Sequence, residues 1–110
     1  METFKDLVRA RLDEIQAERK ILDIKMWLEE FGMVEMETAD KSKKYYTLIQ
    51  NPFNFEIRVW FSEENRNIVV NLWDVDDEPY ECVFYLAEYS AEEIYNRIVE
   101  LVENEVKRAL

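Results

Sequence analysis

The spacing of apolar residues changes twice along this chain of 110 residues. From 3 to 31 they recur every three or four positions, which is typical of an amphipathic helix. From 33 to 88 they alternate with polar residues, as in strands that bury one face. After Ser90 the helical period returns, and Glu93 completes a capping box with that serine. The sequence therefore predicts a helix, a sheet and a second helix, in that order.

The first predicted helix begins at about Thr3 and ends at about Phe31, where Gly32 supplies a left-handed cap. It would be about 42 Å long at 1.5 Å per residue, longer than any strand that follows. It therefore either breaks near the polar stretch 16–20 or extends beyond the body with its first turns. Its apolar residues form one stripe along most of its length (Phe4, Leu7, Val8, Leu12, Ile15, Leu22 and Met26) and a second in its later half (Ile21, Ile24, Leu28 and Phe31).

Five strands are expected between the helices, at 33–38, 44–50, 53–61, 67–75 and 80–88. Their connections are short enough for hairpins, so an antiparallel meander is the simplest arrangement. The predicted fold class is α+β, with a single antiparallel meander sheet of about five strands. The long N-terminal helix and the C-terminal helix pack on one face of it. No linker, repeat or low-complexity stretch interrupts the chain, which favours one domain over residues 1–110.

The third predicted strand indicates which side chains point away from the core. Its alternate apolar residues from 53 to 61 must face the helices. Across the next turn we expect Phe61 to lie opposite Ile68. Leu72 is then expected opposite Cys82. The outer face would carry five large apolar side chains: Trp60, Val69, Trp73, Val83 and Tyr85. Exposed apolar area of this kind marks a contact site, unless these side chains bury one another or a divided first helix covers them.

The net charge of −11 is concentrated in residues 62–89, which carry −7 of it. Such a field attracts a basic protein and repels nucleic acid. The helix–sheet–helix order is similar to that of the double-stranded RNA-binding domain, which places lysines at the start of its last helix. Residues 90–93 read Ser-Ala-Glu-Glu here, so we reject that function. The expected partner is a second copy, in a homodimer, or a basic protein, with no nucleic acid and no membrane.

The chain lacks most parts of a common active site. It has no histidine, one cysteine and one glycine. These counts exclude an imidazole general base, a cysteine zinc cluster and a phosphate-binding glycine loop, and no cofactor is expected. Cys82 is expected to face inward as a small apolar side chain. The basic run of Lys41, Lys43 and Lys44 is expected to be a solvated loop.

Two groups of carboxylates remain as weak candidates for chemistry. The first is the acidic turn of Asp74, Asp76, Asp77 and Glu78. It is a weak metal candidate, because a calcium loop needs about 12 residues with a central glycine, and a solvated turn is favoured. The second is Glu56 with Glu81. The expected register places them on either side of Trp73, where they resemble an acid–base pair.

Together these features favour a small acidic, non-catalytic interaction module, such as an inhibitor, an adaptor or a chaperone-like protein. Its size, charge and element order are similar to those of the dimeric chaperones of type III secretion. An acidic mimic of nucleic acid is the alternative, and a hydrolase that uses carboxylates alone is a third. One cysteine and no signal-like start favour the cytoplasm. A protein of a thermophile or a mobile element would fit this composition.

Overall fold

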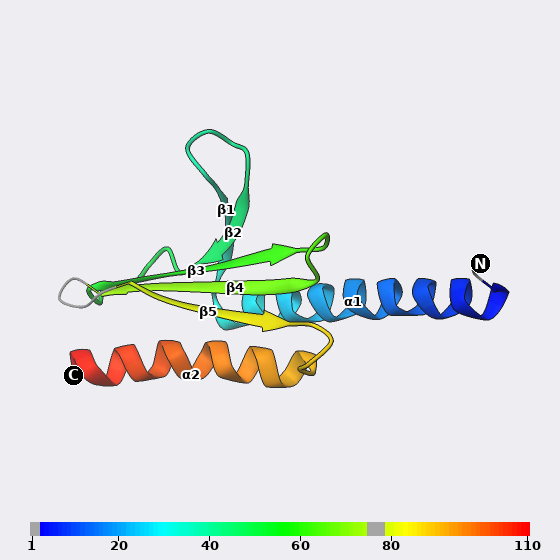
Figure 1. Cartoon of the computed structure of the whole chain (residues 1–110). Helices are drawn as coiled ribbons and strands as arrows, with labels where there is room; N and C mark the ends of the chain where they lie inside the picture. The colour runs from blue at the N-terminus through cyan, green and yellow to red at the C-terminus, as the bar shows by residue number, and fades with distance from the viewer. Residues whose placement is uncertain (1–2, 75–78) are drawn as a thin grey trace.

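The computed structural model of the chain describes residues 3–74 and 79–110. It confirms the predicted α+β fold and the order of the elements (Figure 1). The helices are α1 (Phe4–Phe31) and α2 (Ala91–Ala109). The strands are β1 (Val34–Glu37), β2 (Lys44–Thr47), β3 (Phe55–Ser62), β4 (Asn67–Asp74) and β5 (Tyr80–Tyr85).

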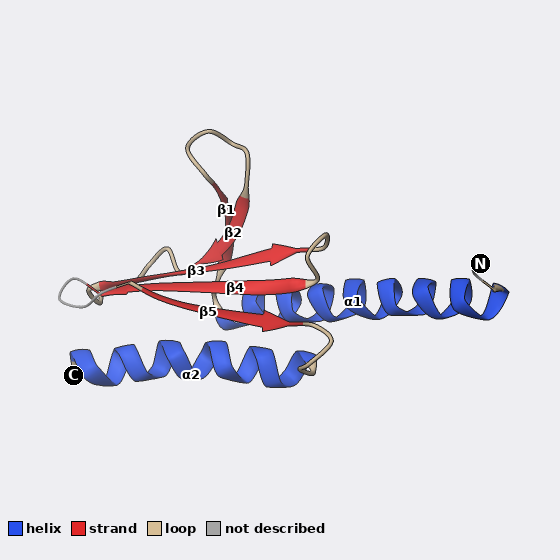
Figure 2. Cartoon of the chain, in the orientation of Figure 1, coloured by secondary structure: helices blue, strands red, loops and turns tan. Residues whose placement is uncertain are grey.

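The strands form one antiparallel meander in the order β1-β2-β3-β4-β5, and both helices lie on the same face of it (Figure 2). The predicted pairing of Phe61 with Ile68 is confirmed. Between the sheet and the helices lies a core of buried apolar side chains. Its fully buried members include Ile57, Val59, Ile68 and Val70 from the sheet and Ile24, Leu28, Ile94 and Ile98 from the helices. Alternate residues of the strands and residues at helical spacing in α2 therefore pack together in one core.

Helix α1 is continuous and overhangs the body, which resolves the alternative that the sequence left open. Every residue from 4 to 16 is exposed, and the first partly buried side chain is Ala17. Lys20 then ties the helix to the body, because its Nζ donates to the carbonyl oxygens of Leu86 at 2.5 Å and Tyr89 at 3.1 Å. The overhang gives the molecule its elongated extents of 57 × 31 × 26 Å (Figure 1).

Gly32 ends α1 in a conformation that other residues rarely adopt. Its φ is 116°, and its N–H donates to the carbonyl oxygens of Leu28 and Glu29, each at 3.1 Å. An added Cβ would meet no atom within 4 Å, so the cost of a side chain here is one of backbone conformation alone.

We expect Gly32→Ala to lower the free energy of unfolding by about 1–2 kcal/mol, because alanine is strained at positive φ. Gly32→Asn should lower it less, since asparagine tolerates the left-handed region better. Urea denaturation of both variants measures the difference. An alanine variant as stable as the wild type would show that this cap is not needed.

Candidate interaction surfaces

The face of the sheet turned away from the helices carries the five side chains predicted as a contact surface. We call it the outer sheet face, and these side chains are Trp60, Val69, Trp73, Val83 and Tyr85. Trp60, Val69 and Val83 form one row across β3, β4 and β5. Tyr85 is 50% exposed, whereas the other four are half-buried. The structure thus brings these residues to one face and covers part of their surface.

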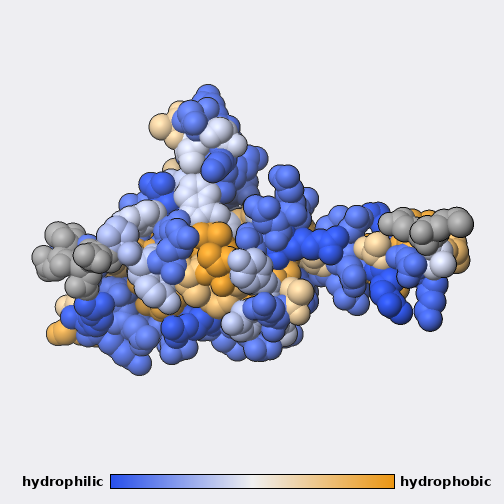
Figure 3. Space-filling model, in the orientation of Figure 1, coloured by the Kyte–Doolittle hydropathy of each residue, from blue (hydrophilic) through white to orange (hydrophobic). Residues whose placement is uncertain are grey.

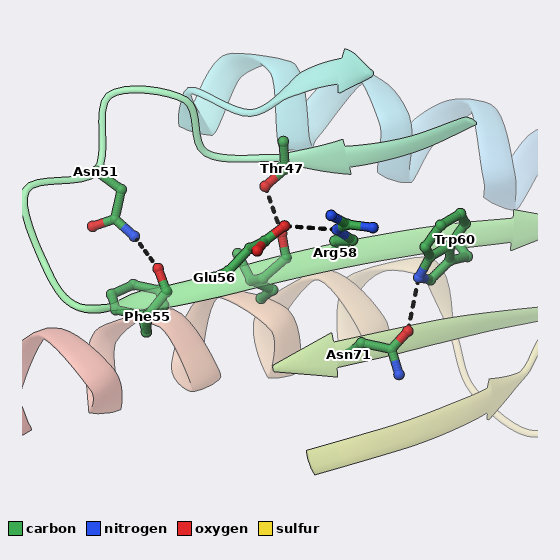
Figure 4. A network of polar contacts seen from close by, with 8 residues as sticks. Thr47, Asn51, Phe55, Glu56, Arg58, Trp60 and Asn71 are labelled. Atoms are coloured by element: carbon green, nitrogen blue, oxygen red, sulfur yellow. Dashed lines mark hydrogen bonds and ion pairs between the residues drawn. The ribbon is translucent and has the colours of Figure 1, made fainter. Parts of the chain in front are cut away.

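A chain of hydrogen bonds fixes the Trp60 side chain on this face. Its indole Nε1 donates to Asn71 Oδ1 at 2.8 Å (Figure 4). Asn71 Nδ2 in turn donates to Glu81 Oε2 at 3.0 Å. The three residues come from β3, β4 and β5, so the bonds run across the strands and hold one ring orientation.

Arg58 joins two further rings of the outer sheet face. Its guanidinium carbon lies 4.4 Å from the ring centre of Tyr45 and 5.4 Å from that of Trp73. Its Nε donates to Glu56 Oε1 at 2.7 Å (Figure 4). Tyr45 also packs on Trp60, with ring centres 4.9 Å apart, and is only 9% exposed. These contacts place cation–π pairs and an ion pair in the middle of the face.

Tyr45 is a residue of this face that the sequence reasoning missed. A signal for it existed, because Tyr45 and Tyr46 are neighbours in a strand, so one of them must face outward. Tyr46 faces inward and donates its hydroxyl to Glu29 Oε1 at 3.0 Å. Burial, together with that hydrogen bond, raises the pKa of Tyr46.

The predicted register between β4 and β5 was wrong by two residues. Leu72 pairs with Tyr80 and not with Cys82, which lies opposite Val70. Residues keep their faces under such a shift because side chains alternate with a period of two, so the apolar pattern could not detect it.

The shift also removes the proposed acid–base pair. Glu81 lies opposite Asn71, so it does not flank Trp73 together with Glu56. Glu81 accepts from Asn71, and Glu56 is paired with Arg58, so each carboxylate has its own role in holding the face.

The hairpin of β1 and β2 stands up from the sheet beside this face (Figure 1). Asp40 braces its loop, accepting from the hydroxyls of Thr38 at 2.6 Å and Ser42 at 2.7 Å. These hydrogen bonds lower the pKa of Asp40 to about 2. A hollow of about 650 Å³ lies between the loop end of the hairpin and strands β3 and β4, lined by Lys43, Lys44, Trp60, Asn67, Val69 and Asn71 among others. The predicted basic loop is exposed, and two of its lysines, Lys43 and Lys44, border the outer sheet face.

A second apolar surface runs along α1. We call it the outer stripe, and it consists of Phe4, Leu7, Val8, Leu12, Ile15, Leu22 and Met26. Their exposed fractions range from 36% at Ile15 to 81% at Phe4. Figure 3 shows apolar surface among hydrophilic side chains on the projecting end of the helix. The buried residues of α1 are instead those of the shorter predicted stripe: Ile21, Ile24 and Leu28.

A buried carboxyl group that the sequence did not predict lies on α2. Glu105 is only 7% exposed, and Arg108 Nη1 lies 3.1 Å from its Oε1. Burial raises the pKa of Glu105, and a hydrogen bond to the Asp74 carboxyl group raises it further, against the opposing charge of Arg108. Glu105 and Asp74 border two hollows beside α2, of about 600 and 410 Å³. Helical spacing could have placed Glu105 beside the apolar stripe of α2, but not its contact with β4.

The remaining predicted sites give less support for a function. Cys82 is a free cysteine, half-buried against the core, as its inward face predicts. Of the acidic turn, only Asp74 belongs to the part of the chain that the structure describes; Asp76, Asp77 and Glu78 lie outside it. Among the described residues, no group of three or more cysteine, aspartate or glutamate side chains is arranged to hold a metal ion.

Neither described helix is long and apolar enough to cross a membrane.

Comparison of the chain with protein-family models, with curated protein sequences and with solved structures gives no match. The surfaces of the molecule itself are therefore what indicates its function.

Proposed function

We propose that this protein is a non-catalytic protein–protein interaction module that binds a partner through the outer sheet face. One observation supports this most: the rings of Trp60 and Trp73 are held in place on a sheet face that neither helix covers. Large aromatic side chains dominate binding energy at interfaces. Rings that are already ordered lose little conformational entropy on binding, so such a face is suited to recognition.

The charge of the molecule supports a basic partner. The net charge is −11, and residues 62–89, which contain β4 and β5, carry −7 of it. Glu56 and Glu81 are exposed on the outer sheet face itself, opposite Trp73 and Asn71. A basic surface would be steered toward this side of the molecule during encounter.

The test is to isolate the partner from native cells on the immobilised protein and then to measure its affinity for variants by calorimetry. Val83→Glu and Tyr85→Ala change the outer sheet face and should each weaken binding at least about 10-fold. Ile49→Glu is the control for an added surface charge, because Ile49 is 62% exposed in the β2–β3 connection and is not one of the five contact residues. Equal affinity of wild type, Val83→Glu and Tyr85→Ala would contradict the proposal.

Salt separates this function from the alternative of a nucleic-acid mimic. Binding through apolar rings should survive an increase to about 0.5 M salt, whereas binding by spaced carboxylates should weaken sharply as the Debye length falls. Loss of the complex at that salt, with no effect of Val83→Glu, would favour mimicry.

A further inference from the structure

We propose that α1 pairs with α1 of a second copy of this chain, in antiparallel orientation, through the outer stripe. This goes beyond the proposed function, because it uses a surface on a different element. Either proposal can therefore be wrong without affecting the other.

The outer stripe lies on the side of α1 that faces away from the core. At 100° per residue, its central residues lie about half a turn from Ile21, Ile24 and Leu28. Within it, apolar residues follow spacings of four and three, at Val8, Leu12, Ile15, Leu22 and Met26. Arg19 occupies the one step of that series that is not apolar. This is the heptad spacing of a coiled-coil seam. One face of α1 then packs on the core, and the opposite face forms the seam.

The seam is complementary to itself when the second helix runs in the opposite direction. With the two-fold axis near residue 17, Leu12 lies opposite Leu22 of the second copy. Val8 lies opposite Met26 in the same register. The remaining layer places Arg19 beside Ile15, where its long side chain can cover the isoleucine and reach solvent. A parallel pair in register would instead place Arg19 against Arg19, which is unfavourable in a seam.

Charges beside the seam enter both orientations, and in the antiparallel register Glu18 lies opposite Glu18 of the second copy at the two-fold axis, which is repulsive. The antiparallel register places Arg9 near Asp23 of the second copy, and symmetry repeats this pair at the other end. A parallel pair would place Glu18 near Asp23, which is repulsive. On the other edge Arg11 approaches Lys25 of the second copy. Lys25, however, is directed toward its own body, with Nζ 5.2 Å from the ring centre of Phe61.

The overhang of α1 supplies the surface that this pairing needs. Residues 4–16 are all exposed, and in the antiparallel register they cover residues 18–30 of the second helix. Apart from Leu7, which lies beside the seam, the six side chains of the outer stripe are on average about half exposed. At about 200 Å² for a fully exposed side chain of this size, they present roughly 650 Å² per copy, within the range of about 600–1,000 Å² per partner of a standard interface.

Light scattering coupled to size exclusion tests the association at concentrations of about 100 µM. We expect twice the chain mass of 13.4 kDa. Leu12→Glu should raise the dissociation constant about 100-fold or more, because two leucines per dimer leave the interface and two charges enter it. Leu7→Glu is the matched control. Leu7 is 53% exposed against 52% for Leu12, but it lies beside the seam, so its variant should remain a dimer.

Arg19→Leu should lower the dissociation constant about 10-fold or more, since it completes the apolar seam. Circular dichroism on each variant reports whether α1 stays helical. A wild-type protein of 13.4 kDa at the highest concentration would overturn the proposal. So would a dimer that Leu12→Glu leaves intact, because its interface would then lie elsewhere.

Single cysteines in a Cys82→Ser background test the orientation with a short bis-maleimide reagent. In the antiparallel register two copies of residue 16 lie about 3 Å apart along the axis, and two copies of residue 26 about 27 Å apart. Gln16→Cys should therefore cross-link to itself, and Met26→Cys should not. Cross-linking of Met26→Cys to itself would require a parallel pair and would overturn the proposed arrangement.

Discussion

Replacing Leu28 with alanine should lower the free energy of unfolding by about 2–5 kcal/mol, whereas replacing Leu7 should change it by about 0.5 kcal/mol or less. Both leucines lie in α1, so helix propensity changes equally in the two variants. Leu28 is fully buried in the core, whereas Leu7 is 53% exposed on the overhang. Urea denaturation at low protein concentration measures both values without a contribution from association.

This pair of variants decides which end of α1 belongs to the core. A large loss from Leu7→Ala with a small loss from Leu28→Ala would mean that the first turns of α1, and not its last ones, pack on the sheet. The outer sheet face would not be affected by that outcome, because its residues contact one another and not the helix.

The element order could be predicted because each change of apolar period coincides with a change of structure. The five strands and the two capped helices all lie where the sequence placed them, although β1, β2 and β5 end one to three residues earlier than expected and β3 ends one residue later. Strand ends depend on pairing with a neighbour, and Gln50 and Glu88 lie beyond the last paired residues of β2 and β5. Composition alone carries no signal for such pairing.

The choice of the core stripe could not be read from apolar content. The longer stripe carries seven large apolar residues, more than the shorter one, yet it is exposed. In physical terms, a helix needs a core face only where it lies against the sheet. The shorter stripe begins at Ile21, just after Ala17, the first residue of α1 that the body covers. The core stripe is thus the one restricted to the covered part of α1, and not the one with more apolar residues.

The five predicted outer-face residues share one face because alternation fixes faces reliably, even when the register is wrong by two residues. What alternation does not give is the set of cross-strand contacts. The bond from Trp60 to Asn71 and the position of Arg58 between Tyr45 and Trp73 depend on which residues lie diagonally across the strands. These contacts decide how much of each ring stays exposed.

The two surfaces lie on opposite sides of the molecule. The outer sheet face points away from the helices, and the outer stripe points away from the sheet. A dimer formed through α1 would therefore leave both outer sheet faces free. Two linked binding faces strengthen attachment to a repeated or dimeric partner by raising the effective concentration of the second contact.

Glu105→Gln should remove a loss of stability that the wild-type protein undergoes as the pH rises. Burial raises the pKa of the Glu105 carboxyl group above its ordinary value of 4.5, and Asp74 adds to this. The folded protein then binds this proton more tightly than the unfolded chain does. The contribution of Glu105 to stability is therefore fully present below pH 4.5 and is lost as the pH rises through the raised pKa.

Calorimetric melting between pH 4.5 and 8 measures this effect as the difference between wild type and variant. At neutral pH we expect Glu105→Gln to be the more stable of the two, and this difference should shrink as the pH falls toward 4.5. Glu103→Gln is the control, because Glu103 is exposed on the same helix and its loss changes the net charge equally. Asp40 does not interfere, since its pKa of about 2 changes stability only as the pH falls below its ordinary value of 3.8. Parallel melting curves for wild type and Glu105→Gln across this range would mean that Arg108 fully compensates the buried charge.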